Sequence, residues 1–104
     1  MPRTYSDKLI LLLMADESGH VGKHLGRVCV KANLPMLYVS EALSVSRMTL
    51  FNWFRGGTVR ASFEPSILAF IALVEKDTEE GKLPANGFRF AKKYIETMIG
   101  REIT

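Results

Sequence analysis

The chain has 104 residues, of which 47% are hydrophobic and 24% charged, a balance typical of one folded globular domain. A chain of this length builds a small core and leaves little material for a large enzyme cleft. Its longest apolar run, residues 9–15, is far shorter than the roughly 20 residues that cross a bilayer. The acidic pair after this run does not resemble a signal-peptide cleavage site. We therefore expect a cytoplasmic protein with no membrane contact.

The net charge of +3 is unevenly distributed. Residues 23–60 contain six lysines or arginines and a single acid, Glu41, whereas residues 61–82 contain five acids and two lysines. Such segregation predicts one positive surface that attracts a polyanion such as nucleic acid. An ordinary solvated surface is the alternative, and charge alone does not decide between the two.

The first third of the chain has helical spacing. Ser6 is a suitable N-cap for a short helix over 6–15, although a run of leucine and isoleucine is also compatible with a strand. Apolar residues over 21–32 recur as in an amphipathic helix, which should end near Asn33 because the residue before a proline disfavours helical geometry. Pro35 suits the first turn of the next helix.

The rest of the chain continues this pattern. After a three-residue connection, Ser46 is expected to cap a helix that Gly56 and Gly57 end. Residues 65–76 are apolar enough for a central helix, and 77–84 form a polar, acidic connection. Asn86 is expected to cap the last helix, over about 86–100. We predict an all-α fold of five or six short helices in one domain, 1–104, with its core at about 20–77.

Residues 36–57 carry the features that bear on function. If residues 46–55 form a helix that advances about 100° per residue, Leu50, Trp53 and Phe54 gather on one side. The opposite side then presents two arginines, an asparagine and two exposed apolar residues, namely Arg47, Asn52, Arg55, Met48 and Phe51. The spacing thus predicts one anchoring side and one solvent-facing side.

The solvent-facing side suits the major groove of duplex DNA. Arginine can form two parallel hydrogen bonds with guanine, asparagine can do the same with adenine, and apolar side chains can contact the methyl group of thymine. A short preceding helix joined by a tight turn would fix the approach of such a helix. A helix without a partner has little reason to expose both Met48 and Phe51.

These residues resemble the helix-turn-helix of the lambda-repressor and Cro-like (XRE-type) family of phage and bacterial DNA-binding proteins. The motif would span 36–56, with its recognition helix at Ser46–Arg55. Its hydrophobic positions are matched by Val39, Leu43, Val45, Leu50 and Trp53. The run Trp53-Phe54-Arg55-Gly56 is also similar to the end of the family's recognition helix.

The resemblance extends over residues 23–74, so that an added N-terminal helix and a C-terminal helix lie outside it. Two positions depart from the family pattern. Ser44 replaces the usual glycine of the turn, which either strains its backbone or alters the turn. Ser40 replaces a usual alanine, which is a small change.

The resemblance implies a sequence-specific regulator of transcription, such as a repressor, bound to double-stranded DNA. It implies base contacts from Arg47 and Met48, with Phe51 further along the helix. It implies phosphate contacts from a second group, Ser46, Asn52 and Arg55, with Tyr38 joining from the preceding helix. We also expect Arg60, in the loop after the recognition helix, to bind DNA. One such module buries only roughly 600–1,000 Å² of its surface on DNA, so we expect a homodimer joined through a terminal helix.

The sequence contains no catalytic or metal-binding pattern. Cys29, the single cysteine, lies among apolar residues and is expected to be buried. His20 and His24 are four residues apart but lack a third ligand. We expect no enzyme, cofactor, metal or small-molecule ligand. The alternative function is a helix-turn-helix-shaped adaptor (an antitoxin, or a phage packaging or host-takeover factor) that holds a protein with Tyr38, Met48 and Phe51.

Overall fold

The computed structural model describes residues 5–103, which form six α-helices and one turn of 3-10 helix, with no strand in that range. In chain order the elements are α1 (Asp7–Met14), α2 (Val21–Ala32), α3 (Met36–Leu43), α4 (Arg47–Phe54), η1 (Ala61–Phe63), α5 (Glu64–Glu79) and α6 (Phe88–Ile99). The predicted all-α fold is confirmed, and the strand alternative for the first segment is wrong. Within these residues no helix is both long and apolar enough to cross a membrane.

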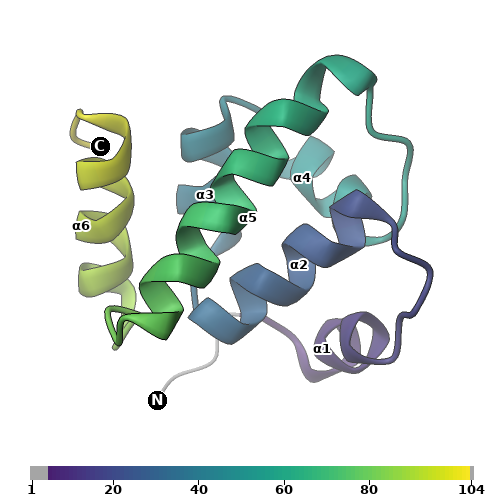
Figure 1. Ribbon diagram of the computed structural model, residues 1–104, viewed down its shortest axis with the longest axis horizontal. Coiled ribbons are helices and arrows are strands. Elements are labelled where there is room, and N and C mark those ends of the chain that lie inside the picture. Colours follow the sequence, from purple (N-terminus) through teal and green to yellow (C-terminus); the bar gives the residue numbers. More distant parts are fainter. Residues whose placement is uncertain (1–4, 104) are drawn as a thin grey trace.

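The helix α2 is the central element (Figure 1). It packs against α1, α4 and α5, while α3 packs between α4 and α6. The buried Cys29 thiol lies in this core, as expected, and its burial raises its pKa. The arrangement puts α6 at the opposite end of the molecule from α1 and α4.

Local capping defines both ends of α2. At its start the His20 Nδ1 accepts hydrogen bonds from the backbone N–H groups of Gly22 (3.0 Å) and Lys23 (3.3 Å). At its end Asn33 adopts the left-handed conformation, with φ of 55°, and its side-chain amide donates to the Ala85 carbonyl at 2.9 Å. The predicted end of this helix is confirmed. His20 acts here as a cap, and the described residues contain no group of three or more potential metal ligands.

Two glycines on α2 permit its close approach to α4 and α1. A Cβ atom at Gly22 would lie 2.5 Å from the carbonyl oxygen of Trp53, and one at Gly26 would lie 2.9 Å from the Leu13 side chain. A larger residue would force the helices apart. The sequence analysis predicted that Gly22 and Gly26 lie in this helix, but it did not indicate that they permit close packing against α4 and α1.

Two predicted boundaries near the C-terminus are wrong. The helix α5 continues to Glu79, so Asp77 lies inside it, where it is buried and accepts a hydrogen bond from the Tyr94 hydroxyl at 2.5 Å. Asn86 does not cap α6: the cap residue is Gly87, with φ of 111° and no side-chain hydrogen bond. At Asp77 a contact with a residue distant in the sequence outweighed the local pattern. At the start of α6 the cap position is taken by a glycine in a conformation that other residues avoid.

Candidate nucleic-acid interface

The connection between α3 and α4 is a three-residue turn. The chain leaves α3 at Ser44, which has φ of 57° and ψ of 42°, and the Val45 N–H donates to the Ser40 carbonyl at 3.0 Å. The Ser46 hydroxyl then caps α4 by accepting from the Thr49 N–H at 3.0 Å. The predicted cap is confirmed. Of the two predicted outcomes at Ser44, the structure has the strained one, because a residue with a Cβ atom occupies the left-handed region.

We predict that Ser44→Gly stabilises the protein by about 0.5–1 kcal/mol. The left-handed conformation costs a residue with a Cβ atom about 1–2 kcal/mol, part of which is offset by the larger entropy that glycine loses on folding. Chemical denaturation measures the change. The matched control is Ser44→Ala, which removes the hydroxyl but keeps the Cβ atom and should give no gain. Equal stabilities of the two variants would contradict strain as the cause.

The two sides of α4 differ as the spacing predicted. Leu50 and Phe54 have no exposed surface and Trp53 is 3% exposed, with its ring 5.3 Å from that of Phe63. On the outer side Met48 is 68% exposed, and Arg47, Asn52 and Arg55 are also exposed. No other segment among the described residues covers these four side chains, which leaves the outer side open to a ligand.

Phe51 differs from the prediction. It was expected to be exposed, but it is half-buried against the core, and the Arg55 guanidinium lies 5.5 Å from the centre of its ring. The helical angle alone placed Phe51 on the outer side, but its side chain packs against the buried core. Its aromatic face therefore supports an arginine through a cation–π contact.

A groove runs along α4 beside the loop that follows it. Its larger part has a volume of about 530 Å³ and its smaller part about 290 Å³. Both parts are lined by Thr49, Trp53 and Thr58, with Asn52 and Arg55 at one end and Arg60 at the other. The lining residues include hydroxyls, an amide and two guanidinium groups but no carboxylate. This chemistry suits a phosphate group, because every polar side chain of the lining can donate a hydrogen bond.

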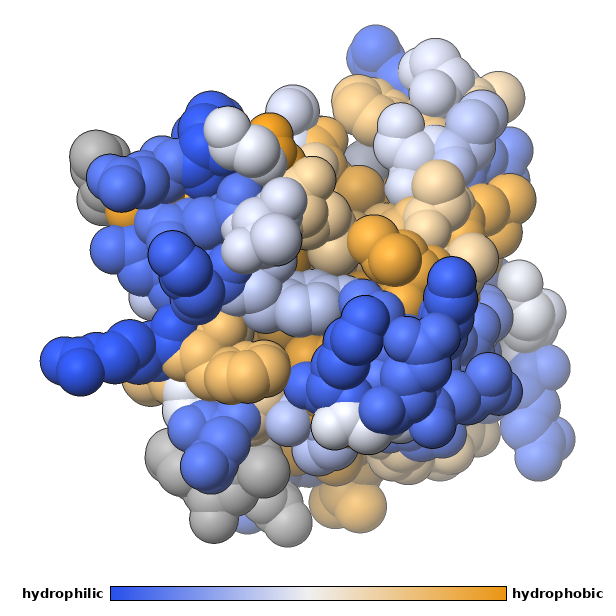
Figure 2. Space-filling view, turned by 60° about the vertical axis from the view of Figure 1, so that its left-hand side comes forward, coloured by the Kyte–Doolittle hydropathy of each residue, from blue (hydrophilic) through white to orange (hydrophobic). Residues whose placement is uncertain are grey.

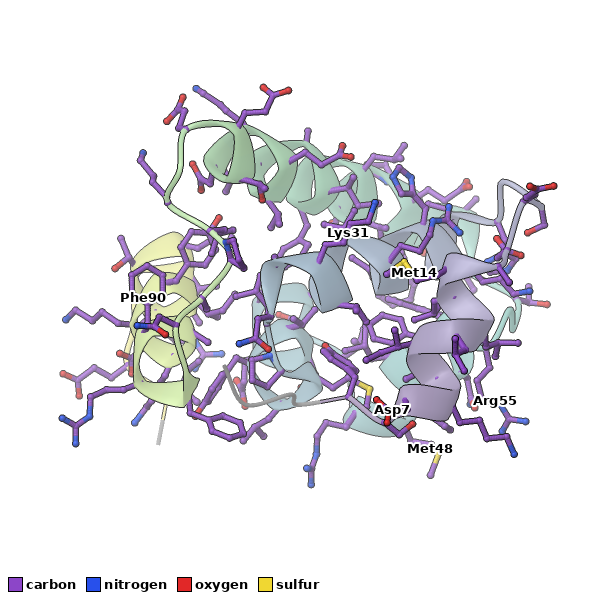
Figure 3. All side chains as sticks on the ribbon, turned by 90° about the horizontal axis from the view of Figure 1, so that it is seen from below. Asp7, Met14, Lys31, Met48, Arg55 and Phe90 are labelled. Carbon is purple, nitrogen blue, oxygen red and sulfur yellow. The ribbon has the colours of Figure 1, made fainter. Side chains whose placement is uncertain are left out.

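The remaining candidate residues lie around this groove. Ser46 lines its smaller part, but its hydroxyl already donates to the Thr49 Oγ1 at 3.0 Å while it caps α4. Tyr38 is half-buried on α3 and lies outside both groove linings. Met48 and Arg55 project away from the body of the molecule, on the side opposite α5 (Figure 3). The structure thus brings together Arg55, Asn52 and Arg60 and leaves Tyr38 apart.

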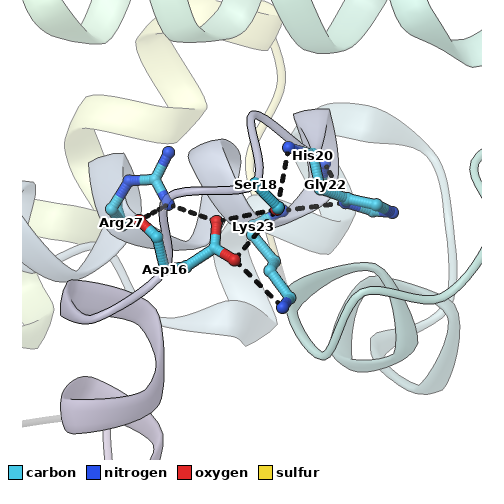
Figure 4. A network of polar contacts seen from close by, with 6 residues as sticks. All are labelled: Asp16, Ser18, His20, Gly22, Lys23 and Arg27. Atoms are coloured by element: carbon cyan, nitrogen blue, oxygen red, sulfur yellow. Dashed lines mark hydrogen bonds and ion pairs between the residues drawn. The ribbon is translucent and has the colours of Figure 1, made fainter.

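The positive surface is smaller than the sequence suggested. Asp16, from the loop after α1, pairs with Lys23 at 3.1 Å and with Arg27 at 3.0 Å, and the Ser18 hydroxyl also donates to it (Figure 4). Two of the six cations of residues 23–60 are therefore paired with one carboxylate of a neighbouring segment, which offsets one of their two positive charges. Within residues 5–103, none of Arg47, Arg55 and Arg60 forms an ion pair. Of the four other cations of residues 23–60, three, Arg47, Arg55 and Arg60, lie on and beside α4.

This network shifts the pKa of Asp16. Burial on its own would raise that pKa, because the Asp16 side chain is only 6% exposed. The hydrogen bonds from Lys23, Ser18 and Arg27 and the charge of Lys23 outweigh burial and lower the pKa from 3.8 to about 2. The folded state therefore favours the ionised carboxylate, which holds the loop against α2.

We predict that Asp16→Asn lowers the melting temperature at pH 7 and that its difference from the unchanged protein shrinks as the pH falls from about 4 to 2. A lowered folded-state pKa stabilises the fold above the unfolded-state pKa, and this contribution is lost on protonation. Thermal unfolding followed by circular dichroism between pH 2 and 7 measures both effects. The control is Glu79→Gln at an exposed position on α5. A pH-independent difference for Asp16→Asn would contradict this interpretation.

A second concavity lies between α5 and α6, on the face shown in Figure 2, where apolar residues surround a hollow that is edged by hydrophilic ones. It has a volume of about 410 Å³, and its apolar lining comes from Leu73, Phe90, Tyr94 and Met98. The sequence did not indicate it, because the end of α5 was assigned to a connection. Its lining includes the Asp77 carboxylate, so it suits a phosphate less well than the groove beside α4.

No known protein family, curated protein or solved structure matches this chain at a significant level.

Proposed function

We propose that this chain is a sequence-specific DNA-binding regulator of transcription that inserts α4 into the major groove, as its resemblance to the lambda-repressor and Cro-like family implies. One observation carries the proposal: an eight-residue helix, fixed by three buried side chains, exposes Arg47, Met48, Asn52 and Arg55 on its outer side. Side chains on a rigid element are positioned precisely enough to distinguish bases. Such a regulator acts in the cytoplasm, of the host if a phage encodes it.

In the proposed complex the two ends of α4 have different tasks. The N-terminal residues Arg47 and Met48 contact base edges, since the first turn of a recognition helix lies deepest in the groove. The C-terminal residues Asn52 and Arg55, together with Arg60 at the other end of the groove, bind one phosphodiester strand. Phe51 supports the Arg55 guanidinium and contributes less to base contact than the sequence suggested.

The competing function is an adaptor that holds a protein on the same side of α4, and the exposed Met48 favours it. The two functions differ in their dependence on salt. DNA binding should weaken steeply between 50 and 200 mM salt because counterions are released from the phosphates, whereas an apolar protein contact should change little.

The direct test is selection of bound duplexes from a random DNA pool, followed by sequencing. An enriched motif, with binding that weakens steeply as salt increases, is the expected result. Binding without enrichment would remove sequence specificity from the proposal. No detectable DNA binding at 50 mM salt would overturn it.

We predict that Arg47→Ala weakens binding to the selected sequence by about 1–3 kcal/mol and relaxes the preference at one base pair, because a bidentate contact with guanine is lost. Fluorescence anisotropy with a panel of single-base variants measures both effects. The matched control is Arg89→Ala, which removes an exposed cation from the distant α6. Equal losses on every sequence would show that Arg47 contacts phosphate only.

We predict that Arg55→Ala weakens binding to all sequences alike and reduces the slope of log K against log salt by about one, because one phosphate contact is lost. Titrations at four or more salt concentrations give the slope. A change in preference at a single base pair, with an unchanged slope, would instead assign Arg55 to base contact.

A further inference from the structure

The concavity between α5 and α6 has two apolar walls. Leu73 of α5 forms one wall. The other wall belongs to α6, where Phe90, Tyr94 and Met98 are four residues apart and therefore lie along one side of the helix. The two helices are joined at one end by residues 80–87 and diverge from there (Figure 1). We refer to this concavity, of about 410 Å³, as the α5–α6 pocket.

The fold leaves both walls of the α5–α6 pocket exposed to water. Leu73 is 40% exposed and Phe90 is 44% exposed, and neither residue belongs to the hydrophobic core. The helix α6 is anchored to that core by Ala91 and Ile95, which have no exposed surface. A ligand that enters the pocket would remove exposed apolar surface from water, which is favourable. Concave apolar surface of this kind is typical of a small-molecule site.

The carboxylate that lines the pocket already has partners. Asp77 accepts a hydrogen bond from the Tyr94 hydroxyl at 2.5 Å, and its other oxygen lies 3.8 Å from the Lys82 ammonium. Burial, together with this hydrogen bond, raises the pKa of Tyr94, so the hydroxyl stays protonated and continues to donate. A cationic ligand would therefore have to displace a partner of Asp77 before it could pair with the carboxylate.

The free charge of the pocket is the Lys93 ammonium. Lys93 is exposed, lines the pocket beside Tyr94 and forms no ion pair with any residue between 5 and 103. The other lysine of the lining, Lys82, pairs with Asp77 and also with Glu80 at 3.3 Å. The Thr97 hydroxyl donates to the Lys93 carbonyl at 2.9 Å, so it is not free to donate to a ligand. An ammonium beside an apolar hollow attracts an anion, more strongly than in open water.

We propose that the α5–α6 pocket binds a small amphipathic monoanion, whose apolar body lies between Leu73 and Phe90 and whose carboxylate pairs with Lys93. The pocket volume lies within the range of roughly 300–1,000 Å³ that small-molecule sites have. One negative charge suits the site better than two, because Asp77 would repel a second. The sequence predicted no small-molecule ligand, since the pocket exists only in the fold.

This proposal does not depend on the proposed function. The helix α6 lies at the opposite end of the molecule from α4, so a ligand in the pocket leaves the outer side of α4 free (Figure 1). The experiments below use no DNA. A protein that binds no DNA could therefore still bind the ligand, and the two proposals fail independently.

The first experiment is titration of the full chain with naphthaleneacetate, followed by amide chemical shifts. We expect saturable shifts that are largest at residues lining the pocket, with a dissociation constant of about 0.1–1 mM because so small a ligand has few atoms that contribute to affinity. Naphthaleneacetamide, which has the same apolar body without the charge, should bind about two- to fivefold more weakly. Shifts centred elsewhere, or a cationic naphthylethylamine that binds as tightly as the acid, would overturn the proposal.

Two double variants test the apolar walls. Leu73→Ser/Phe90→Ser removes one side chain from each wall, and we expect it to bind naphthaleneacetate at least about tenfold more weakly. The matched control is Leu68→Ser/Phe88→Ser, which changes the same residue types on the same helices at exposed positions outside the lining, and it should bind normally. Equal affinities of the two variants, with the helical circular dichroism of both retained, would overturn the proposal.

Lys93→Gln tests the ion pair at an exposed position where the fold does not depend on the side chain. The variant should bind the acid and the amide equally well, because its affinity for the neutral amide is unchanged and its extra affinity for the acid is lost. The matched control Lys92→Gln, at the neighbouring position of α6 outside the lining, should keep the two- to fivefold preference for the acid. A preference that Lys93→Gln also keeps would overturn the pairing of the carboxylate with Lys93.

Discussion

The packing of α4 against α2 determines which side chains of α4 face solvent. Leu50, Trp53 and Phe54 are buried there, and each large apolar side chain contributes about 1.5–3 kcal/mol when fully buried. The approach is close because Gly22 lies against the Trp53 carbonyl. Together these three side chains outweigh the roughly 1–2 kcal/mol of strain at Ser44. The rotation of α4 about its own axis is therefore determined by packing, and its polar side chains face solvent as a result.

Electrostatic pairing then decides which cations remain available to a ligand. A count along the sequence treats Lys23 and Arg27 as part of a positive segment, but in the fold they hold Asp16 in place (Figure 4). Glu41, the single acid of that segment, is likewise paired with Arg101 at 2.9 Å. What is left is a local concentration of charge beside α4. Such a distribution favours one defined contact with a polyanion over general attraction.

Local rules predicted the parts of this structure that depend on neighbours in the sequence. The caps at Ser6 and Ser46, the end of α2 near Asn33 and the two-sided character of α4 follow from residue type and helical spacing. The buried Asp77 and the half-burial of Phe51 did not follow, because each depends on contacts from other helices. Periodicity gives the direction of a side chain on its own helix, whereas tertiary packing decides what lies in that direction.

The same distinction applies to α1. Its spacing predicted a helix, and its buried Leu9 and Leu13 account for its attachment to the core. Nothing within the described chain covers Leu11 and Leu12, although burial of each would contribute favourable free energy.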